Sequence, residues 1–131
     1  GALIMKIVNA KFNDEPRVIV WGSGRPIREW LHVDDAAKAM LLSLKAKSFV
    51  GPLNIGVGKG ISIIDLAILI KDLSGYNGEL ILDPTKPDGA LHKTVDGSKG
   101  FKHFNWRPQK NLRAGVLETI EWYEGNLNGR N

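Results

Sequence analysis

Cysteine is absent from the 131 residues of the chain. Disulfide bonds and thiolate-bound metal ions are therefore excluded, and the composition suits a reducing cytoplasm, where we expect this protein to be found. Long apolar runs are also lacking. The opening residues 1–8 are apolar, but a lysine interrupts them and they are far too short to span a bilayer. We therefore expect a protein that does not contact a membrane.

Blocks of like charge are missing as well. The 18 basic and 14 acidic residues give a net charge of +4 and are scattered along the chain. Residues 1–50 hold eight basic and five acidic side chains, residues 51–100 five and six, and residues 101–131 five and three. A continuous basic stripe is not formed, so we expect no nucleic-acid partner. A mildly basic surface instead suits small anionic ligands.

The length fits a single domain, residues 1–131, which can bury roughly two-thirds of the surface that its unfolded chain exposes. Position 1 is not Met, and we expect the chain to be a fragment of a longer protein. Short apolar runs alternate with longer segments of helical periodicity. This pattern predicts an α/β fold with a small mixed sheet and flanking helices.

A helix is predicted shortly after residue 33. Asp34 or Asp35 is a suitable N-cap for it. An apolar stripe along one side of this helix comprises Ala37, Met40, Leu41 and Leu44. Residues 53–55 then predict a short strand, and residues 94–95 a further brief one.

A glycine-rich segment, Gly-Val-Gly-Lys-Gly at residues 56–60, follows a predicted strand and precedes a helix. Backbone amides in such a place often bind a phosphate. The spacing fits neither a dinucleotide fingerprint, which needs glycine where Ile61 stands, nor a P-loop, in which serine or threonine follows the lysine directly. We favour a tight turn that needs positive φ, with nucleotide binding as the less favoured alternative.

Residues 21–35 combine glycine, two arginines and two tryptophans in a connection between apolar segments. The guanidinium of Arg28 matches a pair of phosphates, and Trp21 offers a flat surface on which a base or sugar can stack. The alternative is an arginine paired with Glu29 or Asp34 and a tryptophan that belongs to the core. The residues of this segment leave both interpretations open.

Residues 86–93, Lys-Pro-Asp-Gly-Ala-Leu-His-Lys, form a loop with two lysines and one carboxylate, which suits either a ligand or solvent. No metal site is predicted, because the three histidines, His32, His92 and His103, lack the spacing of ligands on one element. Ser23 stands in Gly-Ser-Gly and not in a nucleophile elbow. We therefore assign no catalytic residue.

Taken in order, these segments resemble the C-terminal part of the extended short-chain dehydrogenase/reductase family of nucleotide-sugar epimerases and dehydratases. The Arg-Glu-aromatic-Leu-His-Val-Asp-Asp string is shared across many members. The Val-Trp-Gly-Ser-Gly run and the Lys-Pro-Asp-Gly loop are more similar to the branch that epimerises and reduces a 4-keto-6-deoxy sugar nucleotide. The resemblance covers residues 2–126 and is carried by residues 20–35, 53–58, 86–89, 93 and 105–108.

The resemblance implies a substrate-binding domain that packs against an NADP-binding Rossmann domain absent from this chain, with a nucleoside-diphosphate sugar between them. In such enzymes the sugar is epimerised through enolate intermediates and then reduced by hydride from NADPH. Carried over by position, the substrate contacts are Lys6, Trp21, Arg28, Asp88 and Lys93. Arg28 would clamp the diphosphate and Trp21 would form a wall of the site. Lys6 stands where bacterial relatives commonly have arginine, so it keeps the positive charge but lacks the guanidinium fork.

The family's glycine-rich cofactor motif and its Tyr-x-x-x-Lys pair have no counterpart here, since Tyr76 is followed four residues later by Leu80 and Tyr123 by Leu127. We therefore expect NADP to be bound mainly by the absent domain and this fragment alone to be inactive. The full-length protein is expected to be a homodimer. Two alternatives remain: the substrate domain of another NDP-sugar 4-epimerase or dehydratase, and a nucleotide-sugar binding module without turnover.

Overall fold

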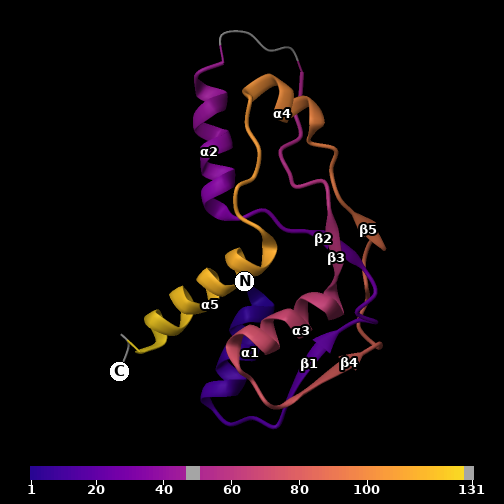
Figure 1. Ribbon diagram of the computed structural model, residues 1–131. Coiled ribbons are helices and arrows are strands. Elements are labelled where there is room, and N and C mark those ends of the chain that lie inside the picture. Colours follow the sequence, from indigo (N-terminus) through magenta and orange to yellow (C-terminus); the bar gives the residue numbers. More distant parts are fainter. Residues whose placement is uncertain (47–50, 129–131) are drawn as a thin grey trace.

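The computed structural model describes residues 1–46 and 51–128, which form helices beside two small sheets (Figure 1). The predicted α/β fold with flanking helices is confirmed. None of the described helices is both long enough and apolar enough to cross a membrane. In chain order the elements are α1 (Ala2–Phe12), β1 (Arg17–Trp21), β2 (Ile27–Glu29), α2 (Val33–Leu44), β3 (Gly60–Ser62), α3 (Ile63–Ser74), β4 (Glu79–Asp83), β5 (His92–Lys93), α4 (Ser98–Phe104) and α5 (Leu112–Asn128).

The strands form two separate sheets. β1 and β4 pair in parallel, with Trp21 opposite Asp83 at their carboxyl ends. β2 is the centre of the second sheet, antiparallel to β3 and parallel to β5, so this sheet is mixed as predicted. The brief strand expected at residues 94–95 is wrong by two positions, because the residues that pair with β2 are His92 and Lys93.

The core lies where α1, α3 and α5 pack together and against β1 and β4, and we call these five elements the body. Helical spacing on α3 buries Leu66, Ala67 and Ile70, as the 3.6-residue period requires. α3 begins where the Ser62 hydroxyl accepts the Asp65 amide, and it ends at Gly75, whose φ of 69° suits glycine. The buried residues of the core are Ile4, Ile7, Val8, Ala10, Val18, Val20, Leu66, Ala67, Ile70, Tyr76, Val116 and Ile120.

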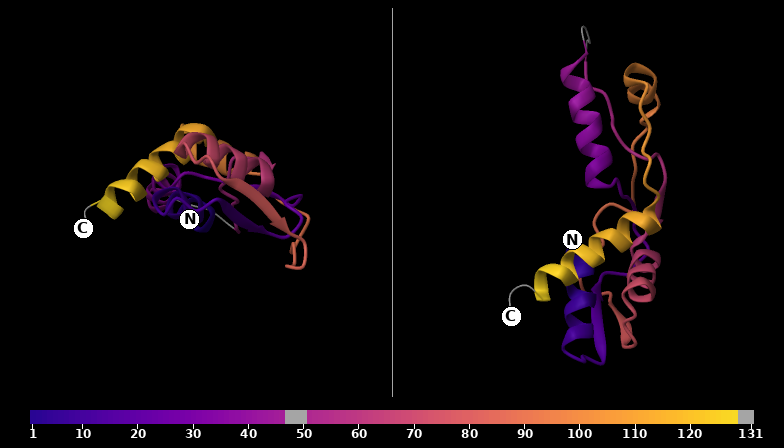
Figure 2. Two further views of the ribbon diagram at one scale, coloured as in Figure 1. Left: turned by 90° about the horizontal axis from the view of Figure 1, so that it is seen from below. Right: turned by 60° about the vertical axis from the view of Figure 1, so that its left-hand side comes forward.

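A second part of the molecule, which we call the arm, consists of α2, residues 51–55 and α4. It extends away from the body in Figures 1 and 2. Residues 53–55 lie against α4, where a Cβ on Gly100 would come within 2.6 Å of the Asn54 carbonyl oxygen. The strand predicted for residues 53–55 is not formed, because among the described residues no other strand lies beside it.

The start of α2 differs from the prediction. His32 is the N-cap, since its Nδ1 accepts the Asp34 amide at 3.3 Å, and the two aspartates proposed as caps lie in the first turn. Asp35 is instead a buried acceptor that joins α2 to the segment before α5. The side chains that α2 buries are Asp35 and Ala39.

The apolar stripe predicted on α2 is present, but it faces outward. Met40 is 67%, Leu41 59% and Leu44 82% exposed, far more than a helix that covers its own core would allow. The pattern correctly predicts a helix with an apolar side. The described part of the chain does not supply the surface that would cover that side.

Candidate functional site

The candidate site lies where the carboxyl ends of β1 and β4 meet the loops that lead to β2 and β5 (Figure 1). Ligands of parallel α/β sheets bind at this edge because the connecting loops gather there. The residues that form the site are Lys6, Trp21, Ser23, Arg28, Lys86, Asp88 and Lys93, and we call them the cationic site.

Trp21 ends β1 and is 63% exposed, so its ring does not belong to the core. Two ammonium groups flank the ring: Lys6 Nζ lies 4.7 Å and Lys86 Nζ 5.8 Å from its centroid. Lys6 reaches this position from α1 and also donates to the Ile19 carbonyl oxygen at 3.4 Å. An exposed indole beside two cations offers stacking and positive charge to the same ligand.

Asp88 holds the loop after β4 against the turn after β1. Its carboxylate accepts the Ser23 amide and the Ser23 hydroxyl, both at 2.6 Å. These bonds lower the pKa of Asp88, with smaller contributions from the charges of Arg25 and Arg28, despite partial desolvation. Gly22 has φ of 85° and no room for a Cβ, which would collide with the Asp88 carboxylate. The Lys86 side chain is thereby kept beside Trp21.

Arg28 lies at the centre of β2, half-buried, and among the residues that the structure describes its guanidinium is bonded to backbone oxygens only. Its two terminal nitrogens donate to the Ile27 carbonyl at 2.8 Å and to the Asp88 carbonyl at 3.4 Å. Among the described residues no carboxylate forms an ion pair with Arg28. Lys93 is its partner in β5, and directly paired residues present their side chains on the same face of a sheet. Most of the guanidinium's capacity for a bidentate anion therefore remains available.

The structure thus brings all five residues predicted as substrate contacts, Lys6, Trp21, Arg28, Asp88 and Lys93, into one region. The alternative pairings of Arg28 with Glu29 or Asp34 are not formed. Lys86 was not among the predicted contacts, although its loop was noted for its two lysines. Ser23 was also missed, because its partner Asp88 is 65 positions away and leaves no local pattern.

The glycine-rich segment at residues 56–60 is a tight connection, and Gly58 has the expected positive φ of 76°. Two of its amides are already used, because the Glu29 carboxylate accepts hydrogen bonds from Val57 and Gly58. A phosphate would have to displace a carboxylate from the same donors. Nucleotide binding by these amides is therefore disfavoured, as the spacing indicated.

His32 is part of a charged cluster between α2 and α5. His32, Asp34 and Glu118 bring possible ligand atoms within 4.8 Å of one another. The ammonium of Lys110 lies among them, 3.6 Å from Asp34 and in an ion pair with Glu118. Glu118, through its hydrogen bond to the ammonium, raises the pKa of Lys110, with Asp34 adding a smaller effect. The ammonium therefore already offsets part of the negative charge of these two carboxylates, and the cluster connects the arm to the body.

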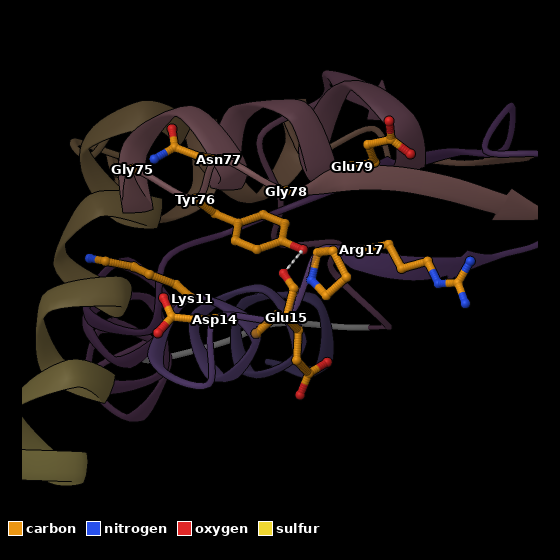
Figure 3. Close-up of a pocket in the computed structure, with 11 residues that line it drawn as sticks. Lys11, Asp14, Glu15, Arg17, Gly75, Tyr76, Asn77, Gly78 and Glu79 are labelled. Carbon is orange, nitrogen blue, oxygen red and sulfur yellow. Dashed lines mark hydrogen bonds between the residues drawn. The ribbon is translucent and has the colours of Figure 1, made fainter.

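A cavity of about 630 Å³ lies at the opposite, amino ends of β1 and β4 (Figure 3). The Tyr76 ring points from the segment before β4 toward the segment before β1. Its hydroxyl donates to the Glu15 carbonyl at 2.9 Å. Burial raises the pKa of Tyr76, with the nearby charges of Glu15 and Glu79 acting in the same direction. Gly78 is required beside it, since a Cβ would collide with the tyrosine hydroxyl. The polar groups of this cavity serve packing, so we do not assign a ligand to it.

Solved structures define the class of protein to which the fold belongs. A GDP-L-fucose synthetase from Naegleria fowleri bound to NADP superposes with a TM-score of 0.85 at 27% identity, over 96% of this chain and 40% of that one. A UDP-glucose 4-epimerase from Thermotoga maritima with UDP-glucose superposes with a TM-score of 0.84 at 27% identity, over 97% and 40%. The fold is that of extended Rossmann-type epimerases and reductases.

Residues 1–56 match the pattern of the NAD dependent epimerase/dehydratase family. GDP-L-fucose synthase 1 of Arabidopsis thaliana is 42% identical over 98% of this chain and 40% of the relative. Probable GDP-L-fucose synthase 1 of Oryza sativa subsp. japonica is 40% identical over 96% of this chain and 38% of the relative. The chain therefore spans about two-fifths of the length of the curated relatives that it matches.

Proposed function

We propose that the chain is the nucleotide-sugar-binding part of an NADP-dependent epimerase/reductase that acts on a GDP-4-keto-6-deoxy sugar. The observation that carries this proposal is an exposed Trp21 flanked by two ammonium groups, next to a guanidinium that no carboxylate neutralises in the described residues. Identity of 40–42% to plant proteins named GDP-L-fucose synthase supports the choice of sugar nucleotide. The cytoplasm stays the expected compartment.

In this proposal Arg28 binds the diphosphate through its free donors, and Lys93 adds positive charge from the neighbouring strand. Trp21 stacks on the base or sugar, and Lys6 and Lys86 attract the anionic ligand toward that ring. Asp88 contributes by holding its loop, because both of its carboxylate oxygens are bonded to Ser23. These residues bind and orient the substrate.

The residues of this chain do not fit an NADP site. Two amides of the glycine-rich loop at residues 56–60 are bonded to Glu29, and the spacing of this loop fits neither a dinucleotide fingerprint nor a P-loop. Neither Tyr76 nor Tyr123 has a lysine four positions later, and the Tyr76 hydroxyl is bonded in the core. We therefore assign cofactor binding and proton transfer to another part of the complete protein and propose that this chain alone is inactive.

The arm is the surface on which we propose that the cofactor-binding part packs. Its apolar side chains are exposed, and a groove of about 450 Å³ between α2, residues 51–55 and α4 has a mostly apolar lining. Residues 53–55 belong to no helix or strand and have no neighbouring strand among the described residues, so their backbone is free to pair with the edge of another sheet. Together, these features suit an α/β domain in the three-fifths of the relatives' length that the chain does not cover.

Substitution on α2 tests this packing in the complete protein. Leu41→Ser should lower its free energy of unfolding by about 1.5–3 kcal/mol, because a side chain that is 59% exposed in this chain becomes buried against the other domain. Leu91→Ser is the matched control, since Leu91 is similarly exposed but lies outside the arm. Equal urea midpoints for the two variants would contradict the proposed packing. The predicted homodimer is measured separately by light scattering.

The ligand is tested by calorimetric titration of the complete protein with GDP, UDP and dTDP. We expect GDP to bind best and Arg28→Ala to weaken its binding about 10- to 100-fold, the value of one or two hydrogen bonds to a charged group. Arg17→Ala is the control, because Arg17 lies on the opposite end of β1 from Trp21. Unchanged GDP affinity in Arg28→Ala would refute the site.

The second candidate function is that of another NDP-sugar epimerase. The TM-score of 0.84 to the UDP-glucose 4-epimerase favours this candidate, because it is nearly the same as the 0.85 to the GDP-L-fucose synthetase and the fold does not distinguish the two. A preference for UDP over GDP in the same titration would select this candidate. Failure of the complete protein to bind any of the three nucleotides would reject both.

A further inference from the structure

Glu29, the last residue of β2, connects three segments of the chain through one carboxylate. One oxygen accepts the amides of Val57 and Gly58, the latter at 3.2 Å. The other oxygen accepts the amide of Val95 at 2.9 Å. Val57 and Gly58 follow the extended residues 53–55, and Val95 follows β5. The carboxylate therefore ties β2 to both of its neighbouring segments.

Two glycines allow the neighbouring segments to approach β2 closely at this carboxylate. A Cβ on Gly56 would collide with the Glu29 carboxylate and with the Val95 side chain. Gly60, which lies opposite Glu29 in the β2–β3 ladder, has no more room: a Cβ there would be 2.6 Å from Ile27 Cγ2 and 2.9 Å from the Arg28 carbonyl oxygen. Both glycines thus hold the chain against β2.

These bonds matter because the sheet itself is small. β2 has three residues and β5 has two, so the ladders that surround Arg28 contain few backbone hydrogen bonds. Bonds to an ionised carboxylate are roughly twice as strong as those between neutral groups. Successive side chains of a strand point to opposite faces, so Glu29 secures β2 from the face opposite to that of the Arg28 side chain.

We propose that Glu29 is a positioning residue for the diphosphate site. It fixes the direction of Arg28, and through Val95 the place of Lys93, without touching the ligand. This inference rests on the proposed function, since it concerns the same anion-binding residues. The site needs such a device because Arg28 itself is held only by two backbone carbonyls, at 2.8 and 3.4 Å.

The test is a double-mutant cycle on GDP affinity in the complete protein, measured by calorimetry. Glu29→Gln keeps the size of the side chain and removes its charge, and we expect it to weaken GDP binding about 5- to 20-fold, within the coupling range of residues in one network. In an Arg28→Ala background the same substitution should change affinity by less than about twofold, because the group that Glu29 positions is gone. A merely structural role would weaken binding equally in both backgrounds.

Gly56→Ala provides a second variant that does not depend on the first one folding. It displaces the carboxylate without removing it, so it should reproduce the loss of GDP affinity. Glu79→Gln is the matched control, as Glu79 is exposed at the amino end of β4. Wild-type GDP affinity in either Glu29→Gln or Gly56→Ala would overturn the inference. Wild-type protein that binds no nucleoside diphosphate would instead overturn the proposed function on which the inference rests.

Discussion

Substitution of Asp35 should lower the free energy of unfolding, because its one buried carboxylate joins the arm to the body. It is 1% exposed, and its Oδ2 accepts the amides of Gln109 at 3.1 Å and Lys110 at 2.9 Å. Replacing it with alanine removes the acceptor from both amides at once. The change is made in the complete protein, with Asp35→Asn as the variant that keeps an oxygen.

The size of the effect follows from these two bonds. Each hydrogen bond to a charged acceptor contributes about 1.5–3 kcal/mol, and the loss is reduced where the freed amide can bind water. Gln109 is exposed and regains water, whereas Lys110 is half-buried. We therefore expect Asp35→Ala to lower the free energy of unfolding by about 2–4 kcal/mol and Asp35→Asn by about 1–2 kcal/mol. In urea this is a fall in midpoint of about 1–2 M for the alanine variant.

The contribution of Asp35 also depends on pH. Burial alone would raise the pKa of its carboxyl, but the amides of Lys110 and Gln109, with the charges of Lys38 and His32, outweigh burial and lower it. A carboxyl whose pKa is lower in the folded state stabilises the protein above its unfolded pKa of about 3.9. The difference between wild type and Asp35→Asn should therefore be full at pH 7 and shrink as the pH falls below about 4.

Asp34→Asn is the control for this prediction. Asp34 is the neighbouring aspartate, its side chain is 61% exposed, and exposed ion pairs contribute little. Urea denaturation followed by circular dichroism compares the variants at pH 7. If Asp35→Ala and Asp34→Asn had the same midpoint, the reasoning about the buried acceptor would be refuted.

Two further predictions concern single groups of the body. Gly125→Ala in α5 should raise the free energy of unfolding by about 0.5–1 kcal/mol, since a Cβ there meets nothing within 4 Å. Gly115→Ala in the same helix should gain less or lose stability, because its Cβ would be 3.0 Å from Cδ2 of the His32 ring, and equal urea midpoints would contradict this. Tyr76→Phe should cost about 1 kcal/mol through the lost bond to the Glu15 carbonyl. The raised pKa of Tyr76 adds stability below pH 10 that is lost as the pH rises through its folded pKa, so the phenylalanine variant should show a weaker alkaline decline in melting temperature.

Local patterns in the sequence predicted the fold class, the helix α2 with its apolar side and the turn at residues 56–60. These features depend on residues that are close together in the chain, which a sequence displays directly. The cap of α2 was predicted at Asp34 or Asp35, whereas the structure has it at His32. Serine, threonine, aspartate and asparagine are the preferred caps, so a histidine whose ring nitrogen accepts the Asp34 amide was not expected.

The candidate site was predicted in part. Arg28 and Trp21 were singled out from the residues of their own segment, and the resemblance to a family added Lys6, Asp88 and Lys93 as predicted contacts. The ties between Ser23 and Asp88, and between Glu29 and Val95, join residues 65 and 66 positions apart. Contacts of that range depend on the complete fold and leave no periodic signal. For the stripe on α2 the apolar pattern was correct, but its exposure could not be predicted, because no described residue covers it.

The ring of Trp21 and the fork of Arg28 stand on different sheets, and Asp88 is bonded to the parts that carry both of them. Its carboxylate accepts from Ser23 in the turn after Trp21, and its carbonyl accepts from Arg28 itself. The turn at residues 22–26 is also bonded to the start of α3 through the carbonyls of Gly24 and Pro26. A change in the length of this turn would therefore move the indole and the guanidinium relative to each other and disturb the first turn of α3 at the same time.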